Sequence, residues 1–404
     1  MNNLRTPFRL KYLVTLFSFF TALLAYSQSK PIGIRFDTAT IERKGNFGDN
    51  WCQTWAIDDH VYTMLDDGNG WWGSREKLKG LPDWEGAMLL QIAGDQHFTG
   101  GDIRKMPGWP INLVNSPLYA YGILAVDSTI YIWLWKSESD TWYHRPIANR
   151  LLYTKDFGRT IHRWDGTLET HQTYRQTDSA AFFFYREDPR PKAGKEAYAF
   201  NWIAFLQHGK ANTAARDEYV YMYAPEQDNP RHLAMARVHK DHILKKSAYE
   251  YFTGIINDIP TWTRDICKRG FTIQYPEAAT GEEWMWASWL PSVVYNAGLG
   301  LYIMTSYGIR DPNRKYWDGW CNQCPLPGSI GFWYSEMPWG PWEQFYYEDL
   351  FYPDDTGNRT YGMKLSPKWI SEDGKRMVLI WSDAGYGHNT YYKWNQMEIE
   401  IVIE

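Results

Sequence analysis

One pattern recurs along the chain: a polar turn, followed by a strand of aromatic and β-branched residues that ends in small or polar residues. Five copies are visible, and they begin at Asp58, Val126, Arg216, Tyr295 and Glu372. Successive copies lie about seventy to ninety residues apart, longer than the usual period of a four-stranded blade, which leaves room for decorated or additional blades. Helical periodicity is nearly absent, and only Lys240 to Tyr251 is a candidate helix. Repeated hairpins without helices predict an all-β chain folded as a β-propeller; the alternative is two packed β-domains.

The N-terminus has the features of a secretory signal peptide. Arg5, Arg9 and Lys11 precede an apolar run from Leu13 to Ala25, which AYSQ follows. This order predicts cleavage near Ser27 or Gln28. The apolar run is short for a stable membrane span. We therefore expect residues 1–27 to be removed, and residues 28–404 to form a single propeller domain, monomeric and periplasmic or secreted, without a membrane span.

A second hairpin type supports the propeller interpretation. The stretch RLLYTKDFGRTIHRW, which begins at Arg150, resembles an Asp-box with Asp156, Gly158 and Thr160 in its turn. Such hairpins are structural devices that recur in propellers. His162 follows the turn, where it packs in the hairpin, faces solvent or contributes to substrate binding.

Aromatic residues are unusually abundant. They make up 17% of the chain, with 23 Trp and 29 Tyr. A surplus of this kind favours stacking on sugar rings, although strands of an all-β protein also use Trp and Tyr for packing. Candidates for sugar stacking, with the core as the alternative, are Trp51, Trp55, Trp71 and Trp72. The net charge of -5 argues against nucleic acid as a partner.

The stretch from Phe200 to Arg237 carries one candidate site. Tyr221 lies in an alternating strand, and Arg237 lies in the next strand after a polar turn, so the two can be neighbours in an antiparallel pair. His208 lies just upstream. A phenol, a guanidinium and an imidazole together could remove a proton from a carbon beside a carboxylate.

Four stretches together carry a family resemblance: DNWCQTWAIDDHVYTMLDDG, FLQHGKANTAARDEYVYMYAP, LAMARVHKDHILKKSAYEYFTG and PWGPWEQF. The chain resembles secreted bacterial propeller proteins that act on polysaccharides, in particular the propeller ulvan lyases and the ulvan oligosaccharide dehydratase of marine Bacteroidetes. The resemblance implies seven blades, although only five markers are visible. It also implies β-elimination on a uronate-containing algal polysaccharide or its oligosaccharides. In that family a Tyr and an Arg sixteen residues further on carry part of the chemistry, and Tyr221 and Arg237 have this spacing.

Elimination at a uronate needs its carboxylate to be neutralised before a base can remove the C5 proton. Arg237 would pair with the carboxylate, and Tyr221 would act as base or acid. The complementary role would fall to His208 or to His144, which follows Trp142 and Tyr143. The sequence leaves open whether the departing group is a sugar, as in a lyase, or a hydroxyl, as in a dehydratase.

Acidic residues near the N-terminus define a rival hypothesis. Asp58, Asp59, Asp66 and Asp67 flank the first marker strand, and paired carboxylates are what a glycoside hydrolase needs. The alternative is that DD and DDG are turn residues on either side of a strand, which the pattern favours. A further hypothesis is a non-catalytic propeller that only binds glycans.

The four cysteines are Cys52, Cys267, Cys321 and Cys324. An even number in an exported chain permits disulfides, whereas CNQC also fits half of a zinc site. A structural zinc could be held by Cys321, Cys324 and Cys267, with His388 as a fourth ligand. The proposed chemistry requires no cofactor.

Overall fold

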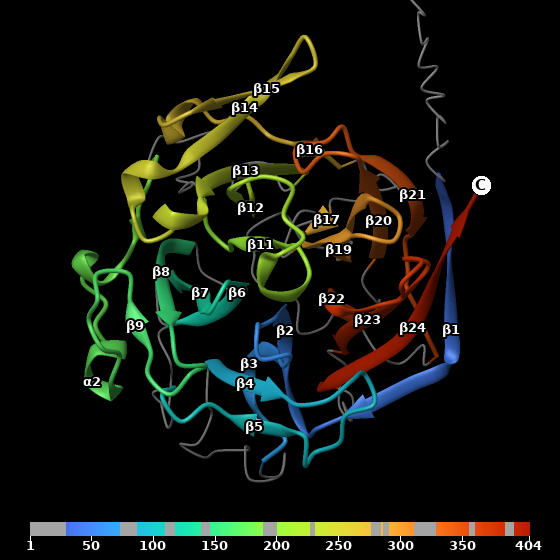
Figure 1. Ribbon diagram of the computed structural model, residues 1–404, viewed down its shortest axis with the longest axis horizontal. Helices are drawn as coiled ribbons and strands as arrows, with labels where there is room; N and C mark the ends of the chain where they lie inside the picture. The colour runs from blue at the N-terminus through green and yellow to red at the C-terminus, as the bar shows by residue number, and fades with distance from the viewer. Residues whose placement is uncertain are drawn as a thin grey trace, which may run out of the picture.

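A computed structural model describes most of the chain. The described residues are 30–72, 87–109, 118–138, 146–188, 200–226, 231–275, 284–285, 291–310, 329–354, 360–383 and 392–404. Within them, the strands form five consecutive antiparallel groups arranged in a ring around a common centre (Figure 1). This is the architecture of a β-propeller.

Each group forms one blade, and its first strand lies next to the centre. Blade 1 contains β2 (Phe47–Trp55), β3 (Val61–Gly70), β4 (Ala87–Ile92) and β5 (Ile103–Lys105). Blade 2 contains β6 (Tyr119–Val126), β7 (Thr129–Ser137), β8 (Pro146–Thr154), β9 (His162–Arg163) and β10 (Phe184–Tyr185).

Blades 3 and 4 are joined into one sheet, because their inner strands β11 and β18 pair in parallel. Blade 3 contains β11 (Ala204–Gln207), β12 (Tyr219–Pro225), β13 (His232–His239), β14 (Glu250–Ile256), β15 (Ile259–Thr263) and β16 (Ile273–Gln274). Blade 4 contains β18 (Ser292–Asn296), β19 (Leu301–Arg310), β20 (Ser329–Ser335) and β21 (Glu343–Glu348), and the short β17 (Trp284–Met285) pairs with the end of β19.

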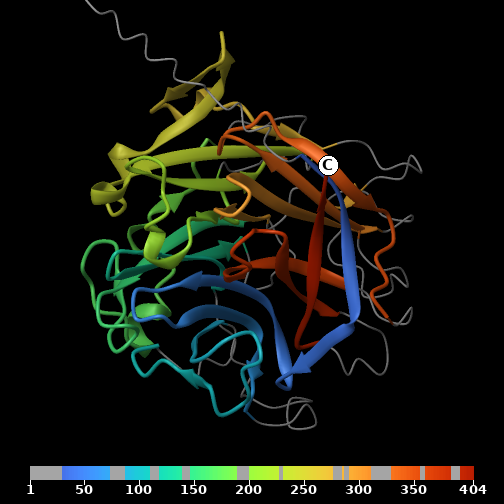
Figure 2. The same ribbon diagram turned by 45° about the vertical axis from the view of Figure 1, so that its right-hand side comes forward.

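Blade 5 closes the ring with strands from both ends of the chain. It contains β22 (Thr360–Ile370), β23 (Arg376–Asp383), β24 (Trp394–Ile403) and β1 (Pro31–Lys44). The outermost strand β1 runs antiparallel to β24, from the pair Pro31 and Ile403 to the pair Lys44 and Trp394 (Figure 2). The first described strand is therefore held in place by the last.

The recurring sequence pattern marks the same element in every blade. Each of the five copies spans the turn between the first and second strands and then the second strand itself, which is β3, β7, β12, β19 or β23. The propeller prediction is confirmed. The described residues form five blades, as the visible markers indicate, rather than the seven that the family resemblance implies.

Helices are short in the described part of the chain. The predicted helix from Lys240 to Tyr251 is wrong: this stretch forms two 3₁₀ turns, η3 (Lys240–His242) and η4 (Lys246–Ala248), before β14 begins. The other helical segments are α2 (His171–Tyr174), η1 (Ser179–Ala181), η2 (Lys210–Asn212) and η5 (Ile266–Lys268). None of the helices among the described residues is long and apolar enough to cross a membrane.

The Asp-box prediction describes a real turn in blade 2. The Asp156 carboxylate accepts hydrogen bonds from the Thr160 backbone N–H at 2.9 Å and from the Thr160 hydroxyl at 2.7 Å. Gly158 has a φ of +82°, and a Cβ there would lie 2.7 Å from the Met106 side chain. The turn therefore needs glycine for its backbone conformation and for its close approach to blade 1.

Strand direction defines two ends of the propeller. We call the end where the inner strands begin and the second strands finish the upper end; it includes Asp49 and Asp66. The lower end is where each inner strand turns into the second strand, and it includes Asp58 and His208. Residues from different blades can meet at either end.

Candidate active site at the upper end

Two aspartates face each other across the first two strands of blade 1. Asp49 in β2 lies directly opposite Asp66 in β3, and Asp67 follows in the sequence. Both are buried: Asp49 is 6% exposed and Asp66 is 1% exposed. Opposite residues of an antiparallel pair have Cβ atoms about 5 Å apart, so the two carboxyl groups share one environment.

The chain geometry around the two aspartates is irregular. The β2–β3 pairing shifts register on both sides of Asp49, and Asn50 and Asp67 have φ values of 56° and 50°. Gly68 allows this arrangement, because a Cβ at that position would lie 2.3 Å from the Phe47 carbonyl oxygen. Bulges of this kind re-aim side chains and are common beside active sites.

Asp49 is held by hydroxyl groups. Its Oδ2 accepts hydrogen bonds from the Tyr392 hydroxyl at 2.8 Å and from the Tyr361 hydroxyl of β22. Burial and then the neighbouring Asp67 raise the pKa of Asp49 well above its usual value, while the two tyrosines and Lys364 oppose this rise. Its second oxygen, Oδ1, has no hydrogen-bond partner among the described residues.

Asp66 has fewer groups that stabilise its charged form. Its Oδ2 accepts a hydrogen bond from the backbone N–H of Ala120, the second residue of β6, at 3.3 Å. Burial, then Asp67, then Asp49 raise the pKa of Asp66 well above its usual value. Its Oδ1 also has no hydrogen-bond partner within the described ranges. Two buried carboxyl groups thus each present one oxygen that no described group occupies.

A buried cation lies near the pair. Lys364 of β22 is 3% exposed, and its ammonium lies 5.8 Å from the ring centre of Tyr307. Burial lowers the pKa of Lys364, while the nearby Cys52 and Asp49 favour its charged form. Cys52 itself donates a hydrogen bond from Sγ to the Tyr121 carbonyl at 2.7 Å, and burial raises the pKa of its thiol.

The predicted pair Tyr221 and Arg237 lies elsewhere. The two residues are opposite each other in β12 and β13, as their spacing predicts, but at the lower end of blade 3. The Tyr221 hydroxyl donates to Asp217 at 2.6 Å, and burial followed by this hydrogen bond raises the pKa of Tyr221. Arg237 is paired with Glu250, with Nη2 and Oε2 2.9 Å apart. The guanidinium is already neutralised by a carboxylate from within the protein.

The predicted histidines do not join this pair at one site. His208 is 2% exposed; its Nδ1 lies 3.2 Å from Asn212 Oδ1, and its ring contacts Tyr295 and Tyr302. Burial lowers the pKa of His208 to about 4, so it is neutral at pH 7. His162 is half-buried in its hairpin and stacks on Tyr153 at 5.5 Å. His144 lies outside the described residues.

The tryptophans proposed for sugar stacking have different surroundings. Trp51 is 1% exposed and donates to Ser382 Oγ at 3.0 Å, so it belongs to the core. Trp71 is partly exposed and packs against Trp51, with ring centres 5.6 Å apart. Trp72 carries Lys105 over its ring, and Trp55 lies at the lower end, where its Nε1 donates to Asp59.

The four predicted acidic residues separate into two pairs at opposite ends of blade 1. Asp58 and Asp59 lie in the lower turn, as the turn interpretation predicts, and Asp59 has a φ of 69°. The carboxylate of Asp58 accepts from the Tyr62 hydroxyl at 2.8 Å. Asp66 and Asp67 instead lie within β3, so the turn interpretation is wrong for them.

The zinc hypothesis falls mostly outside the described residues. Cys321, Cys324 and His388 are not described, and Cys267 lies in η5 on blade 3. Among the residues that are described, no group of three or more His, Cys, Asp or Glu side chains could hold a metal ion.

Comparison with known proteins gives structural neighbours alone. No family model matches the sequence, and no curated protein matches it. A family 117 glycoside hydrolase of Zobellia galactanivorans is 9% identical with a TM-score of 0.47, covering 91% of this chain and 90% of its own. An α-L-arabinofuranosidase of Podospora anserina is 8% identical with a TM-score of 0.43, covering 92% and 95%. A GH43_1 enzyme of Xanthomonas citri is 13% identical with a TM-score of 0.39, covering 93% and 92%.

The prediction of β-elimination, and with it the enzyme class of carbon–oxygen lyase, is wrong. The neighbours are described as glycoside hydrolases, not as ulvan lyases or dehydratases. The geometry gives a physical reason within the chain, because the arginine meant for a uronate carboxylate is paired with Glu250. The expectation of a β-propeller stands.

Sequence reasoning missed Asp49, Tyr361, Tyr392 and Lys364. Asp49 is the one that a signal could have revealed, because it lies in FGDNW, upstream of the first marker strand. In a propeller, the strand before each marker is the inner one, so an aspartate there faces the centre. The tyrosines and Lys364 come from blade 5 and its connection, more than 300 residues away, and only the closed ring brings them to Asp49.

Proposed function

We propose that the chain is a glycoside hydrolase that uses Asp49 and Asp66 as its pair of carboxyl groups. The observation that carries the proposal is their arrangement: two buried aspartates opposite each other, each with one oxygen that no described group occupies. Hydrolysis of a glycosidic bond needs two carboxyl groups, one to protonate the leaving oxygen and one to act as base or nucleophile.

We assign the two roles from the surroundings of each aspartate. Asp49 accepts two tyrosine hydroxyls and has Lys364 nearby, all of which favour its carboxylate form. Asp66 is opposed by two neighbouring carboxylates and has only backbone N–H donors to offset them. Asp66 is therefore the neutral acid that donates a proton to the leaving oxygen, and Asp49 is the carboxylate that acts as base or nucleophile. Environments that separate two carboxyl groups in this way are how acid and base roles are set.

The substrate in this proposal is a polysaccharide or an oligosaccharide. The abundance of aromatic residues supports a glycan, since flat rings cover the apolar faces of sugars. We further propose that the enzyme works outside the cytoplasm as one catalytic domain of residues 28–404, on the basis of the signal-peptide pattern. Mass spectrometry of the exported protein would check this, because an unprocessed Met1 terminus would contradict it.

The experiment measures new reducing ends released from arabinan, xylan, agarose and ulvan, together with the ultraviolet absorbance of unsaturated uronates. Hydrolysis gives reducing ends without that absorbance. Asp49→Asn and Asp66→Asn should each lower the rate by about 10²- to 10⁴-fold, which is the usual contribution of an acid or base. The control is Asp58→Asn, in the lower turn of the same hairpin, which should keep its activity.

Two results would overturn the proposal. One is a rate within a factor of a few of the parent for either Asn variant on a substrate that the parent cleaves. The other is an equal loss in Asp58→Asn, which would show that the rate reports on the integrity of blade 1 rather than on the carboxyl pair.

A further inference from the structure

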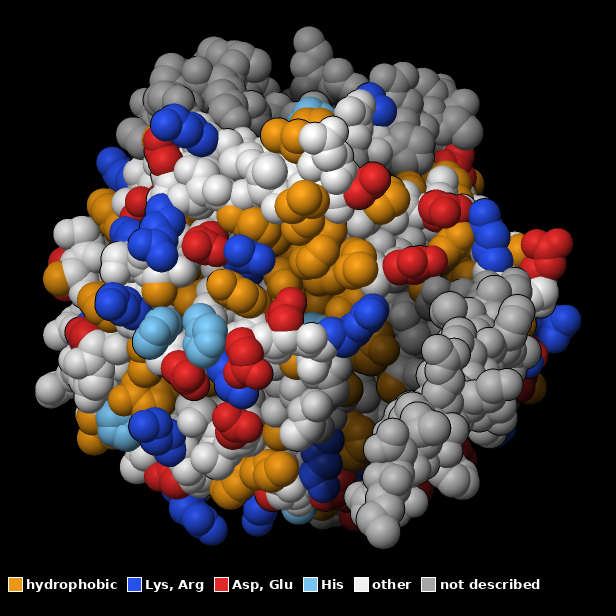
Figure 3. Space-filling view, turned by 45° about the horizontal axis from the view of Figure 1, so that its top comes forward, with side chains coloured by type: hydrophobic (Ala, Val, Ile, Leu, Met, Phe, Trp, Pro, Cys, Tyr) orange, Lys and Arg blue, Asp and Glu red, His pale blue; other side chains and the backbone are white. Residues whose placement is uncertain are grey.

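An aromatic platform lies at the lower end of blades 3 and 4, away from the two aspartates. We define it as Tyr219, Trp262 and Trp339, which are partly exposed and pack on a buried cluster that contains Tyr221. Figure 3 shows hydrophobic side chains gathered in the middle of the face that carries β14 to β16, with charged side chains around them. The mechanism proposed above uses none of these residues.

The rings of the platform are held in fixed positions. Trp262 and Trp339 have ring centres 6.3 Å apart at an interplanar angle of 85°, and both contact Tyr221. The Arg237 guanidinium lies 4.2 Å from the ring centre of Tyr219 and 4.2 Å from that of Trp262. Glu250 fixes the guanidinium in turn. Because these contacts order the side chains in advance, a ligand would not have to bear that entropic cost.

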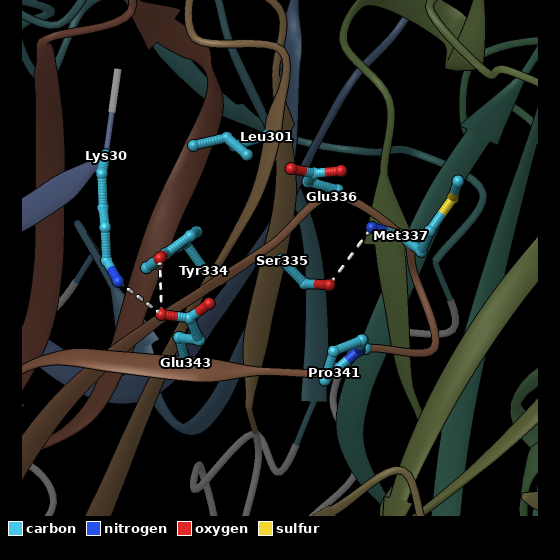
Figure 4. Close-up of a pocket in the computed structure, with 9 residues that line it drawn as sticks. Lys30, Leu301, Tyr334, Ser335, Glu336, Met337, Pro341 and Glu343 are labelled. Carbon is cyan, nitrogen blue, oxygen red and sulfur yellow. Dashed lines mark hydrogen bonds and ion pairs between the residues drawn. The ribbon is translucent and has the colours of Figure 1, made fainter. Parts of the chain in front are cut away.

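A cavity of about 440 Å³ adjoins the loop that carries Trp339. Glu336, Met337, Gly340 and Pro341 of this loop line it. On the opposite wall, the Lys30 ammonium and the Tyr334 hydroxyl both point to the Glu343 carboxylate, at 2.9 and 2.7 Å (Figure 4). The Lys30 and Glu343 side chains are half exposed and can donate and accept further hydrogen bonds, whereas Tyr334 is buried. The loop thus has aromatic rings on one flank and a polar cavity on the other.

We propose that this platform and the adjoining cavity form a second glycan-binding site, which holds a polysaccharide chain without cleaving it. The chain would stack a pyranose ring on Trp262 or Trp339, and it would hydrogen-bond through its hydroxyls to Glu343, Lys30 and Glu336. The cavity has the size of a small-molecule site, and its lining combines apolar side chains such as Met337 and Pro341 with hydrogen-bonding groups, as a sugar site requires. Stacking on aromatic faces with polar groups at the ring edge is how proteins bind pyranoses.

Charged side chains around the aromatic platform make a protein partner the weaker alternative. Arg237 and Glu250 lie among the rings, and Asp217 and Glu218 border them. Charged residues are depleted from the core of protein interfaces. A sugar, by contrast, uses such groups as hydrogen-bond partners at the edge of the stacked ring.

The test separates binding from cleavage. It uses Asp66→Asn as the parent, so that a polysaccharide stays intact, and native gels cast with xylan, arabinan, agarose or ulvan. We expect the parent to be retarded by at least one of them. Trp262→Ala or Trp339→Ala, each added to the Asp66→Asn parent, should weaken polysaccharide binding about tenfold or more, as expected for the loss of a stacked ring. Tyr347→Ala, on the exposed side of β21, is the matched control and should be retarded like the parent.

The site is proposed for a glycan-active protein, but its test does not depend on the hydrolase assignment. The tryptophan variants, made with Asp66 intact, should cleave short oligosaccharides at the parent rate while losing rate on long polysaccharide. Retardation equal to the parent's, or retardation of the parent by no polysaccharide in the panel, would overturn the proposal. The proposal would also be overturned if analytical ultracentrifugation showed dimers that the Trp339→Ala variant does not form, since the platform would then bind a second copy of the chain. Thermal unfolding of each variant confirms that it is folded.

Discussion

The Asp66→Asn variant should become more stable relative to the parent protein as the pH rises. In the folded state burial, and then the neighbouring Asp67 and Asp49, raise the pKa of Asp66. In the unfolded chain its pKa returns to about 3.9. Between these two values the native state holds a proton that the unfolded state has lost, so the free energy of unfolding falls as pH rises. Asparagine has nearly the shape of the protonated acid and does not titrate, and the variant therefore avoids this loss.

The magnitude follows from linkage. Each such proton changes the free energy of unfolding by about 1.4 kcal/mol per pH unit. Between pH 5 and pH 7 the advantage of the variant should therefore grow by up to about 3 kcal/mol, whereas near pH 4 the two proteins should be nearly equal. For a chain of this length the entropy of unfolding converts each kcal/mol into only about 1 °C of Tm. Urea denaturation at a series of pH values is the more sensitive assay.

Asp373→Asn is a control of opposite sign. The Asp373 carboxylate accepts hydrogen bonds from the Ser371 hydroxyl at 2.6 Å and from the Lys375 backbone N–H, and these lower its pKa. Its contribution to stability is present above about pH 4 and lost below it, so the variant should be less stable at pH 7 and equal at low pH. The reasoning would be refuted if the difference in free energy of unfolding between Asp66→Asn and the parent did not change with pH. It would also be refuted if Asp66→Asn became less stable than the parent as the pH rises.

Three further variants test the site and the fold. Tyr392→Phe removes a hydroxyl donor from Asp49, so the pKa of Asp49 should rise further. We expect kcat/KM to fall about 10- to 100-fold and the acid limb of the pH–rate profile to move to higher pH. Tyr221→Phe should leave turnover unchanged and lower the free energy of unfolding in urea by about 1 kcal/mol, since it removes only a hydrogen bond to Asp217. Lost turnover would instead indicate an active site at the lower end. Arg269→Ala should destabilise the fold by about 3 to 5 kcal/mol, because Arg269 pairs bidentately with buried Glu226 and also with Asp188; a loss below 1 kcal/mol in urea would contradict this.

The fold was predictable because its signal is local and repeated. Every marker strand carries its own turn and its own alternation of side chains, and none of this requires knowledge of distant residues. The spacing of Tyr221 and Arg237 also predicted their pairing correctly. What that spacing could not show was the partner of Arg237, because Glu250 comes from the next strand and cancels the charge on which the elimination hypothesis depended.

The candidate site was only half visible in the sequence. Asp66 and Asp67 stood out as acids, but DDG also matches a turn, and the register that places Asp66 opposite Asp49 depends on a bulge at Asn50. The groups that hold Asp49 come from the far end of the chain. No local pattern records which tyrosine will reach a given carboxylate once the ring has closed.

The pairing of β1 with β24 also sets an order of events in folding. Ile403 is made more than 370 residues after Pro31, yet the two are partners in one ladder. Blades 1 to 4 can form while the chain is still emerging, but blade 5 waits for its third and fourth strands to meet. Contacts this distant in sequence form slowly. Until they form, β24 and β1 present open edges that another chain can pair with, so the period just before ring closure is when this protein is most exposed to aggregation.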